Sequence, residues 1–171
     1  MPEPSAPLTL VLGGARSGKS RHAEAIVTAL PGPWRYIATA EPRDDEMRRR
    51  IAEHRARRGA GWTTAEAPLD LAAALAEAGS RPALVDCLTL WLTNVMLAAH
   101  GLDRAFPTLE AALAARAAPT VLVANEVGLG IVPENALARS FRDAAGRLNQ
   151  RLATRADAVW FLVAGLPMRV K

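Results

Sequence analysis

Five short runs of apolar residues recur along the chain, and none of them alternates with polar positions. They cover residues 8–12, 34–38, 83–85, 120–124 and 158–163. A continuous apolar run of this length is typical of a strand that is buried on both faces of a sheet. Helical stretches separate the runs, so the pattern predicts a three-layer α/β domain with a mostly parallel central sheet.

The stretches between these runs carry the end signals of helices. Asp44 can cap a helix with an acidic first turn, which Gly59 and Gly61 would end. A second helix is predicted to open at Pro68 and to run to Gly79. Both of these helices lie between the predicted strands 34–38 and 83–85.

Two further helical regions have apolar faces. Residues 88–117 are expected to form two helices separated by a break at residues 100–101, with Trp91 and Met96 as packing residues. The longest helix is predicted over residues 134–154, and one apolar stripe at helical spacing is assigned to the core. That stripe contains Leu137, Phe141, Ala145, Leu148 and Leu152.

A glycine-rich loop directly follows the first predicted strand. It matches the pattern G-x-x-x-x-G-K-[ST], and it has the required strand before it and helix after it. In such a loop main-chain amides wrap an anion, Lys19 reaches the β- and γ-phosphates, and the Ser20 hydroxyl can ligate Mg²⁺. The alternative is a glycine-rich turn without a ligand. The loop consists of Gly13, Gly14, Ala15, Arg16, Ser17, Gly18, Lys19 and Ser20.

An acidic residue, Asp86, ends the third apolar run. A carboxylate at the carboxyl end of a buried strand can hold Mg²⁺ opposite the Ser20 hydroxyl while phosphate oxygens lose a bond. The sequence leaves open whether Asp86 instead caps the helix that follows. The polar, glycine-bearing segment 125–135 follows another strand, so it is a candidate substrate or magnesium contact or a plain connection.

Basic side chains are concentrated in one short segment. The net charge of +4 would also suit a nucleic-acid-binding protein, but the aromatic residues that stack bases are scarce, with one tyrosine and three phenylalanines. A local patch that handles phosphate groups therefore fits better, although a solvated arginine-rich helix face stays open. The segment contains Arg48, Arg49, Arg50, Arg55, Arg57 and Arg58.

One histidine, His54, lies among these arginines. Nearby positive charge disfavours the imidazolium form and keeps a ring nitrogen unprotonated near neutral pH, which a histidine nucleophile requires. The arginines could also stabilise charge that develops on an attacked phosphate. On spacing alone, a half-buried structural histidine remains an alternative.

Length and cysteine content describe the setting of these motifs. We expect residues 1–7 to be a flexible lead and residues 8–171 to form a single domain. The single cysteine, Cys87, cannot form an internal disulfide, and the sequence has neither a signal-peptide pattern nor an apolar run long enough for a membrane span. These features predict a cytoplasmic protein.

Several segments, taken together, resemble the bifunctional adenosylcobinamide kinase / adenosylcobinamide-phosphate guanylyltransferase family of cobalamin biosynthesis. The resemblance implies a RecA-like P-loop fold and a homo-oligomer, a trimer in this family. It also implies that ATP or GTP phosphorylates adenosylcobinamide, and that GTP then donates GMP through a guanylylated histidine, here His54. The segments are residues 13–21, 36–40, 45–55, 62–66, 125–135 and 141–150.

The same resemblance extends the expected nucleotide site. The chain departs from some members in its seven-residue lead and in having Asp86 where others carry glutamate, which leaves the magnesium geometry open. The implied contacts are Ala38, Thr39, Ala40, Arg55, Ala56, Arg57, Arg58, Glu66 and Asp86.

Two other functions stay open at this point. One is a P-loop small-molecule kinase that works only by direct γ-phosphoryl transfer and needs no covalent histidine. The other is a basic, nucleotide-responsive protein that contacts nucleic acid through residues 48–58.

Overall fold

A single sheet of seven strands forms the middle layer of the computed structural model, which describes residues 7–171 apart from the side chain of Arg50. The predicted flexible lead lies outside this range except for Pro7. The strand order is β3-β2-β4-β5-β1-β6-β7, and the last strand alone runs antiparallel to its neighbour. The strands are β1 (Leu8–Gly13), β2 (Trp34–Ala38), β3 (Trp62–Glu66), β4 (Ala83–Asp86), β5 (Thr120–Asn125), β6 (Ala158–Val163) and β7 (Leu166–Arg169).

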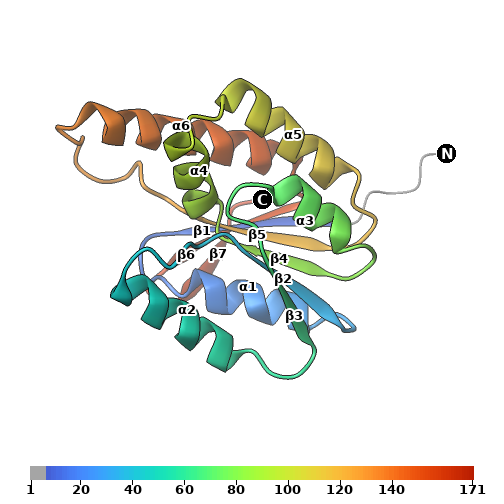
Figure 1. Ribbon diagram of the computed structural model, residues 1–171. Coiled ribbons are helices and arrows are strands. Elements are labelled where there is room, and N and C mark those ends of the chain that lie inside the picture. Colours follow the sequence, from blue (N-terminus) through green and yellow to red (C-terminus); the bar gives the residue numbers. More distant parts are fainter. Residues whose placement is uncertain (1–6) are drawn as a thin grey trace.

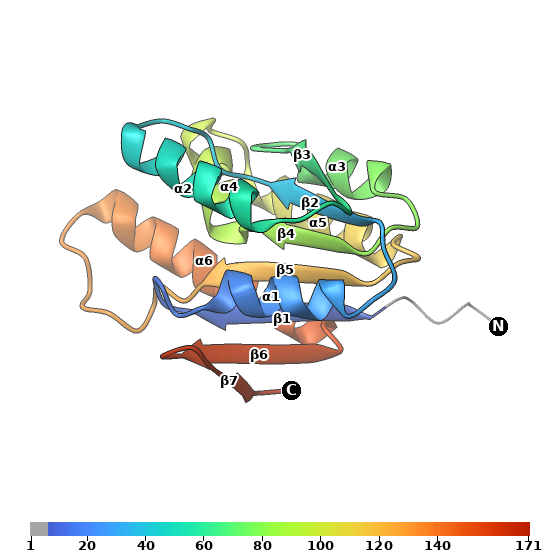
Figure 2. The ribbon, with the colours of Figure 1, turned by 90° about the horizontal axis from the view of Figure 1, so that it is seen from below.

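Helices cover both faces of this sheet, as Figures 1 and 2 show. Helices α1 and α2 lie on one face, and α3, α4, α5 and α6 lie on the other. The predicted three-layer α/β domain is therefore confirmed. The helices are α1 (Lys19–Thr28), α2 (Asp45–Arg57), α3 (Leu71–Glu77), α4 (Leu88–Leu97), α5 (Leu102–Ala114) and α6 (Ala136–Arg155).

The register of the central strands explains why their apolar runs do not alternate. One row of paired positions across four neighbouring strands consists of Ile37, Val85, Leu122 and Leu10. All four side chains are fully buried under the layer formed by α3, α4, α5 and α6. The intervening positions, such as Leu84, are buried against the opposite face. Burial of each side chain of this size stabilises the folded state by about 1.5–3 kcal/mol. The packing of helices on both faces of the sheet therefore stabilises the three-layer arrangement.

The five predicted strands are all present, and the sequence interpretation missed two more. Strand β3 is an edge strand in which only Trp62 and Ala65 are half-buried and the other positions are exposed, so it lacks the continuous apolar run used to find the others. Strand β7 is exposed throughout and contains Pro167, which an edge strand tolerates. It follows a tight turn in which Ala164 and Gly165 both have positive φ.

The helix ends agree with their predicted signals to within a few residues. The Asp44 side chain accepts a hydrogen bond from the amide of Met47 at 2.7 Å and so caps α2, as expected. Helix α3 starts later than predicted because Asp70, and not Pro68, caps it by accepting from the amide of Ala73.

The assignment of Leu137 to the core was wrong. Its side chain is 60% exposed, because it lies in the first turn of α6, beyond the part of that helix that packs on the core. The other members of the predicted stripe are buried or packed against the core. Within the described residues, none of the helices has the length and apolarity that crossing a membrane demands.

Candidate active site

The carboxyl ends of the parallel strands meet at one edge of the sheet, and a pocket of about 330 Å³ opens there. The P-loop follows β1, Asp86 ends β4, and Asn125 ends β5. Helix α2 lies next to these strand ends and contributes side chains to the pocket lining. This is the place where ligands bind in open parallel sheets. Of the predicted site residues, the structure brings Lys19, Ser20, Ala38, Ala40, His54, Arg55, Arg58, Glu66 and Asp86 together in its lining.

The P-loop has a backbone that only glycine accommodates at two points. A side-chain carbon at Gly13 would lie 2.4 Å from the hydroxyl oxygen of Ser17, and Gly18 has φ +90°. Gly18 is also the N-cap of α1 and supplies no side-chain cap, so the first-turn amides of this helix remain available to an anion. The loop therefore fits a phosphate group, which argues against a plain turn.

Two polar groups in the loop are placed for a ligand. The Lys19 ammonium donates to the carbonyl oxygen of Gly14 at 2.9 Å, so it lies folded over the loop. The Ser17 hydroxyl oxygen is buried and has no hydrogen-bond partner among the described residues. Both groups would gain partners from a bound phosphate.

Asp86 is tied to the pocket and not to the helix that follows it. Helix α4 has Cys87 as its N-cap, with no side-chain cap. Oδ2 of Asp86 instead accepts a hydrogen bond from the Tyr36 hydroxyl at 2.9 Å, and the same oxygen lies 3.7 Å from Nδ1 of His54. The capping alternative for Asp86 is therefore excluded.

The pKa of His54 is lowered from its ordinary value of 6.5, the direction that the sequence predicted. The largest cause is burial of the ring, however, and the next largest influence is the charge of Asp86, which raises the pKa. Arg57 and Arg58 lower the pKa further, whereas Asp86 and Glu24 oppose the shift. A neutral imidazole at neutral pH follows from this balance.

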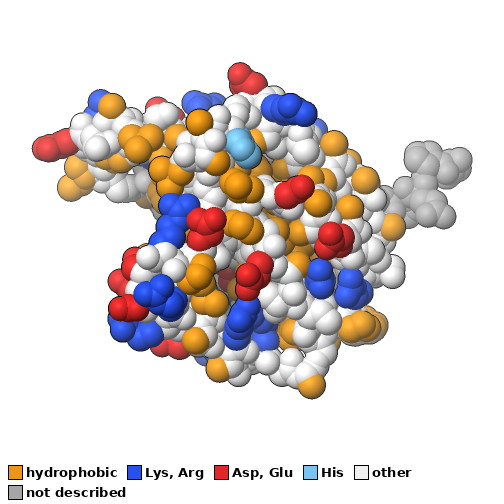
Figure 3. Space-filling view, in the orientation of Figure 1, with side chains coloured by type: hydrophobic (Ala, Val, Ile, Leu, Met, Phe, Trp, Pro, Cys, Tyr) orange, Lys and Arg blue, Asp and Glu red, His pale blue; other side chains and the backbone are white. Residues whose placement is uncertain are grey.

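Two arginines of α2, Arg55 and Arg57, are held by specific partners. Arg55 donates to Glu66 at 2.5 Å, and Arg57 lies 3.4 Å from both Oε1 of Glu24 and Nδ1 of His54. On the face shown in Figure 3, basic side chains over α2 are interspersed with acidic ones. This is the pattern of a local network and not of a continuous positive surface.

Arg58 is oriented by an aromatic ring. Its guanidinium carbon lies 3.6 Å from the centre of the Tyr36 ring, and Trp62 packs edge-on against that ring with centroids 6.0 Å apart. A guanidinium over an aromatic face is held by the ring quadrupole. Tyr36 therefore orders both Arg58 and Asp86.

Thr39 is not part of the pocket lining. Its side chain is fully buried, and its hydroxyl donates to the carbonyl oxygen of Cys87 at 2.6 Å and accepts from the amide of Cys87 at 2.9 Å. Asn94 in turn donates to the carbonyl oxygen of Thr39. Burial raises the pKa of the Cys87 thiol to about 11, so this thiol is protonated near neutral pH.

Tyr36 and Glu24 contact predicted site residues but were not themselves predicted, and Asn125 was expected only as part of the candidate segment 125–135. Tyr36 and Glu24 were missed because their partners are 50 and 33 positions away in the sequence. Asn125 lines the pocket, and its amide oxygen is buried without a partner among the described residues. The position of Asn125 at the end of a strand was the sequence signal for this contact. Leu129 and Ile131 of the same predicted segment are exposed.

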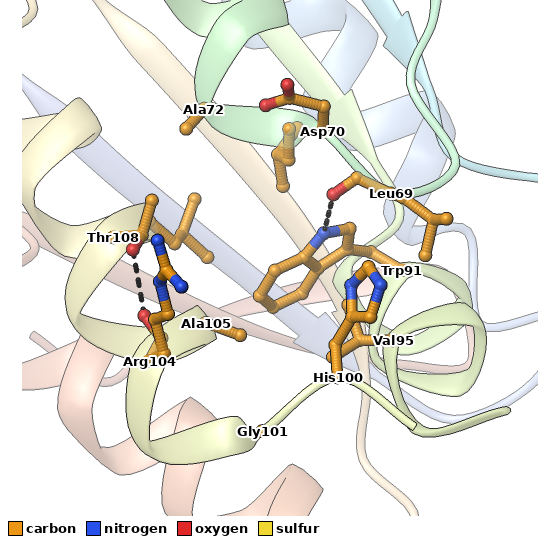
Figure 4. Close-up of a pocket in the computed structure, with 12 residues that line it drawn as sticks. Leu69, Asp70, Ala72, Trp91, Val95, His100, Gly101, Arg104, Ala105 and Thr108 are labelled. Atoms are coloured by element: carbon orange, nitrogen blue, oxygen red, sulfur yellow. Dashed lines mark hydrogen bonds between the residues drawn. The ribbon is translucent and has the colours of Figure 1, made fainter. Parts of the chain in front are cut away.

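A second pocket, of about 440 Å³, lies between α3, α4 and α5 and has none of the predicted site residues in its lining (Figure 4). The Trp91 ring forms part of its wall and donates to the carbonyl oxygen of Leu69 at 2.9 Å. His100 and Arg104 lie at its rim. The predicted packing role of Trp91 is confirmed by its 3% exposure.

Comparison with known proteins connects this geometry to a family. Residues 9–170 match the family model for cobinamide kinase / cobinamide phosphate guanyltransferase. The chain belongs to this family. The resemblance found in the sequence is therefore confirmed, and it extends over nearly the whole chain.

Two curated members of the family are close in sequence. The bifunctional adenosylcobalamin biosynthesis protein CobP of Pseudomonas aeruginosa is 53% identical over 95% of this chain and 96% of its own length. The protein CobU of the same description from Salmonella typhimurium is 45% identical over 96% and 99%. Such coverage leaves no large segment of either relative unmatched.

Solved structures support the fold alone. An ATPase from the type III secretion system of pathogenic bacteria superimposes with a TM-score of 0.56 at 15% identity, over 95% of this chain and 56% of that one. The predicted RecA-like architecture agrees with this similarity.

Proposed function

We propose that the protein phosphorylates adenosylcobinamide with ATP or GTP and then transfers GMP from GTP to adenosylcobinamide phosphate, giving adenosylcobinamide-GDP in cobalamin biosynthesis. Family membership supports both activities. The observation that carries the proposal is that Lys19 of the phosphate loop and His54 line one pocket. A nucleotide held there would lie near both Lys19, for phosphoryl transfer, and His54, for transfer of GMP.

In the kinase step the P-loop would hold the triphosphate and leave its γ-phosphate open to the corrinoid hydroxyl. The Lys19 ammonium would move from the Gly14 carbonyl to the β- and γ-phosphates and stabilise charge as the phosphoryl group leaves. The remaining P-loop residues would contribute amides to the same phosphates, as predicted from the sequence.

In the transferase step His54 would act as the nucleophile and carry GMP. A lowered pKa supplies a ring nitrogen with a free lone pair. Arg55 and Arg58 line the same pocket and would neutralise charge on the α-phosphate, while Glu66, Ala38 and Ala40 complete its walls. Thr39, Ala56 and Arg57 are not part of the pocket lining, but we propose that they too contact the bound nucleotide.

Mg²⁺ is expected to accompany the nucleotide. The described residues contain no group of three His, Cys, Asp or Glu side chains that could hold a metal by themselves. Ser20 and Asp86, both in the pocket lining, would hold it together with phosphate oxygens, and a bound Mg²⁺ would supply positive charge to those oxygens.

One pocket for two reactions implies that the nucleotide or α2 changes position between the steps. The kinase step needs the γ-phosphate at the acceptor, and the transferase step needs the α-phosphate at His54. We therefore expect a single triphosphate site, and crystals with GTP analogues that show two separate full sites would contradict this.

We further propose that the protein works as a homo-oligomer, a trimer by resemblance to the family, in the cytoplasm. Exposed apolar side chains on the connection between β5 and α6 support an assembly, since Ile131 is 98% and Leu129 79% exposed. A nucleic-acid partner is not expected, because the ion pairs of Arg55 and Arg57 already engage these side chains.

Labelled GTP tests the proposal and separates it from a simple kinase. With Mg²⁺ and GTP labelled at the α-phosphate, we expect acid-labile, alkali-stable label on the chain that is lost in His54→Ala. That variant should still transfer γ-phosphate to adenosylcobinamide. A chain that phosphorylates the corrinoid but never takes up label would be a kinase without a covalent intermediate.

A basic nucleic-acid-binding protein would behave differently in both assays. It would show salt-sensitive binding to DNA and no turnover of cobinamide. Either result would displace the proposed enzyme.

A further inference from the structure

Three arginines line the candidate pocket, and they differ in their partners. Arg48 donates to Asp45 at 2.6 Å, and Arg55 donates to Glu66 at 2.5 Å. Arg58 takes part in none of the ion pairs of the described residues, and its buried Nη1 has no hydrogen-bond partner among them. A buried donor without a partner is costly, so Arg58 is the arginine of this lining that is open to an anionic ligand.

An aromatic ring, and not a carboxylate, orients the Arg58 guanidinium. The guanidinium carbon lies 3.6 Å from the centre of the Tyr36 ring. That ring is fixed at two points, because its hydroxyl donates to Asp86 at 2.9 Å and Trp62 packs edge-on against it. A guanidinium held by its flat face keeps the N–H donors at its edge for an anion. Tyr36 therefore supplies a platform for Arg58 without using up its charge.

We propose that Arg58, positioned by the ring of Tyr36, binds the α-phosphate during transfer of GMP, whereas Lys19 serves the β- and γ-phosphates, so that the two reactions depend on different cations. This inference rests on the proposed function and gives Tyr36 a positioning role. Arg58 follows His54 by four positions, and both side chains line the same pocket, so a phosphorus atom attacked by His54 would lie near the open guanidinium. Arg55 would act on the same phosphate only after release from its carboxylate partner.

Transfer of GMP develops negative charge at the α-phosphate. The lone pair of the His54 ring forms a bond to the α-phosphorus of GTP, the bond from that phosphorus to the bridging oxygen breaks, and pyrophosphate leaves with the electron pair. A guanidinium that is already fixed stabilises charge on the two nonbridging oxygens without reorganisation. When a phosphate oxygen of adenosylcobinamide phosphate attacks the same phosphorus, the ring leaves with its electron pair, and Arg58 serves the same two oxygens again.

GTP with one sulfur on the α-phosphorus tests the contact directly. Adduct formation on His54 is followed in a single turnover with Mg²⁺ and either GTP or one of the two sulfur diastereomers. Because sulfur is a poorer acceptor than oxygen, we expect one diastereomer to react about tenfold more slowly than the other in the wild type. Arg58→Ala should slow the reaction of GTP about a hundredfold and lose this difference between diastereomers. A repeat with Mn²⁺, which accepts sulfur more readily, shows whether the metal causes the difference.

Tyr36→Leu and Tyr36→Phe test the positioning role, because both remove the hydroxyl and only Tyr36→Phe keeps the ring under Arg58. We expect guanylylation of His54 to be about tenfold slower in Tyr36→Leu than in Tyr36→Phe, and about equal in the two once Arg58→Ala is added. A merely structural ring would give the same tenfold difference in both backgrounds, which would overturn the positioning role. If Tyr36→Leu does not fold, Arg58→Lys keeps the charge without the flat fork and should be about tenfold slower than the wild type, and full activity would overturn the role of the ring.

Phosphorylation of adenosylcobinamide by the same variants tests the division between the two cations. Because Lys19 serves that step, Arg58→Ala should slow it at least about tenfold less than it slows guanylylation. Equal slowing of both reactions would contradict the division.

The outcomes separate this inference from the proposed function. If Arg58→Ala keeps the full difference between the sulfur diastereomers, or if Mn²⁺ abolishes that difference in the wild type, Arg58 does not bind the α-phosphate, and the guanylylated histidine still stands. If the wild type forms no adduct on His54 with GTP, both the inference and the transferase half of the proposed function fail.

Discussion

The Thr39 hydroxyl is bonded to both main-chain polar groups of Cys87, at 2.6 Å to its carbonyl oxygen and 2.9 Å to its amide nitrogen. These bonds join the segment after β2 to the segment after β4, immediately beyond Asp86. The position of the Asp86 carboxylate in the pocket therefore depends on a side chain that does not itself line the pocket.

Thr39→Val should lower the free energy of unfolding by about 2 kcal/mol, because it leaves the buried amide of Cys87 without its partner and leaves the Cys87 carbonyl only the amide of Trp91. Urea denaturation would measure the loss. Thr39→Ser keeps the hydroxyl and should cost less than half as much. Equal losses in the two variants would mean that the methyl group, and not the hydroxyl, is responsible.

Glu24→Gln should slow guanylylation of His54 about threefold to tenfold. Arg57 loses its anionic partner Glu24, so its guanidinium stays hydrogen-bonded to Nδ1 of His54. Single-turnover labelling with α-labelled GTP measures this rate. Phosphorylation of adenosylcobinamide should change less, since His54 takes no part in it. Unchanged labelling would show that Glu24 does not control the position of Arg57.

Asn125→Ala should weaken nucleotide binding about fivefold without loss of stability, because its buried amide oxygen has no partner among the described residues and is available to a ligand. Calorimetry and thermal unfolding measure the two effects. Asn135→Ala is the control, since it removes the cap of α6, where Asn135 accepts from Ala138 at 3.1 Å. That variant should lose about 1 kcal/mol of stability and keep its nucleotide affinity, and the reverse pattern would contradict both assignments.

Stability should fall in acid in a way that Glu110 partly controls. Hydrogen bonding from Arg151 holds the pKa of the Glu110 carboxyl below its ordinary value of 4.5, and Arg155 adds to this. A lowered folded-state pKa stabilises the protein above pH 4.5, and this contribution is lost as the pH falls through the folded-state value. The stability difference between wild type and Glu110→Gln should therefore shrink from pH 6 to pH 3, and a constant difference would contradict the assignment.

Much of the fold could be predicted from the sequence because its central strands are buried on both faces. Strand β5, for example, is a continuous apolar run with five buried positions. Strand β3 gave no such signal, because as an edge strand it buries little and holds Thr63 and Thr64 at the surface. Leu137 was wrongly assigned to the core because helical spacing predicts which face of a helix is apolar but not how far along the helix the core extends.

The candidate site was predicted where local chemistry was sufficient. The P-loop follows from eight consecutive residues, and the strand-end position of Asp86 follows from the run before it. The hydrogen bond from Tyr36 to Asp86 joins two strands, and the contact between Arg57 and Glu24 joins two helices. Spacing along one element cannot reveal such pairs, because they depend on how separate elements pack.

The connection between β5 and α6 has a practical consequence for anyone who works with the enzyme. Leu129, Ile131 and Val132 in this connection and Leu137 in the first turn of α6 are largely exposed, so the chain has an apolar surface on the segment that follows Asn125 of the candidate pocket. If copies of the chain cover this surface, turnover per subunit would decline on dilution, and rates measured at one concentration would not transfer to another.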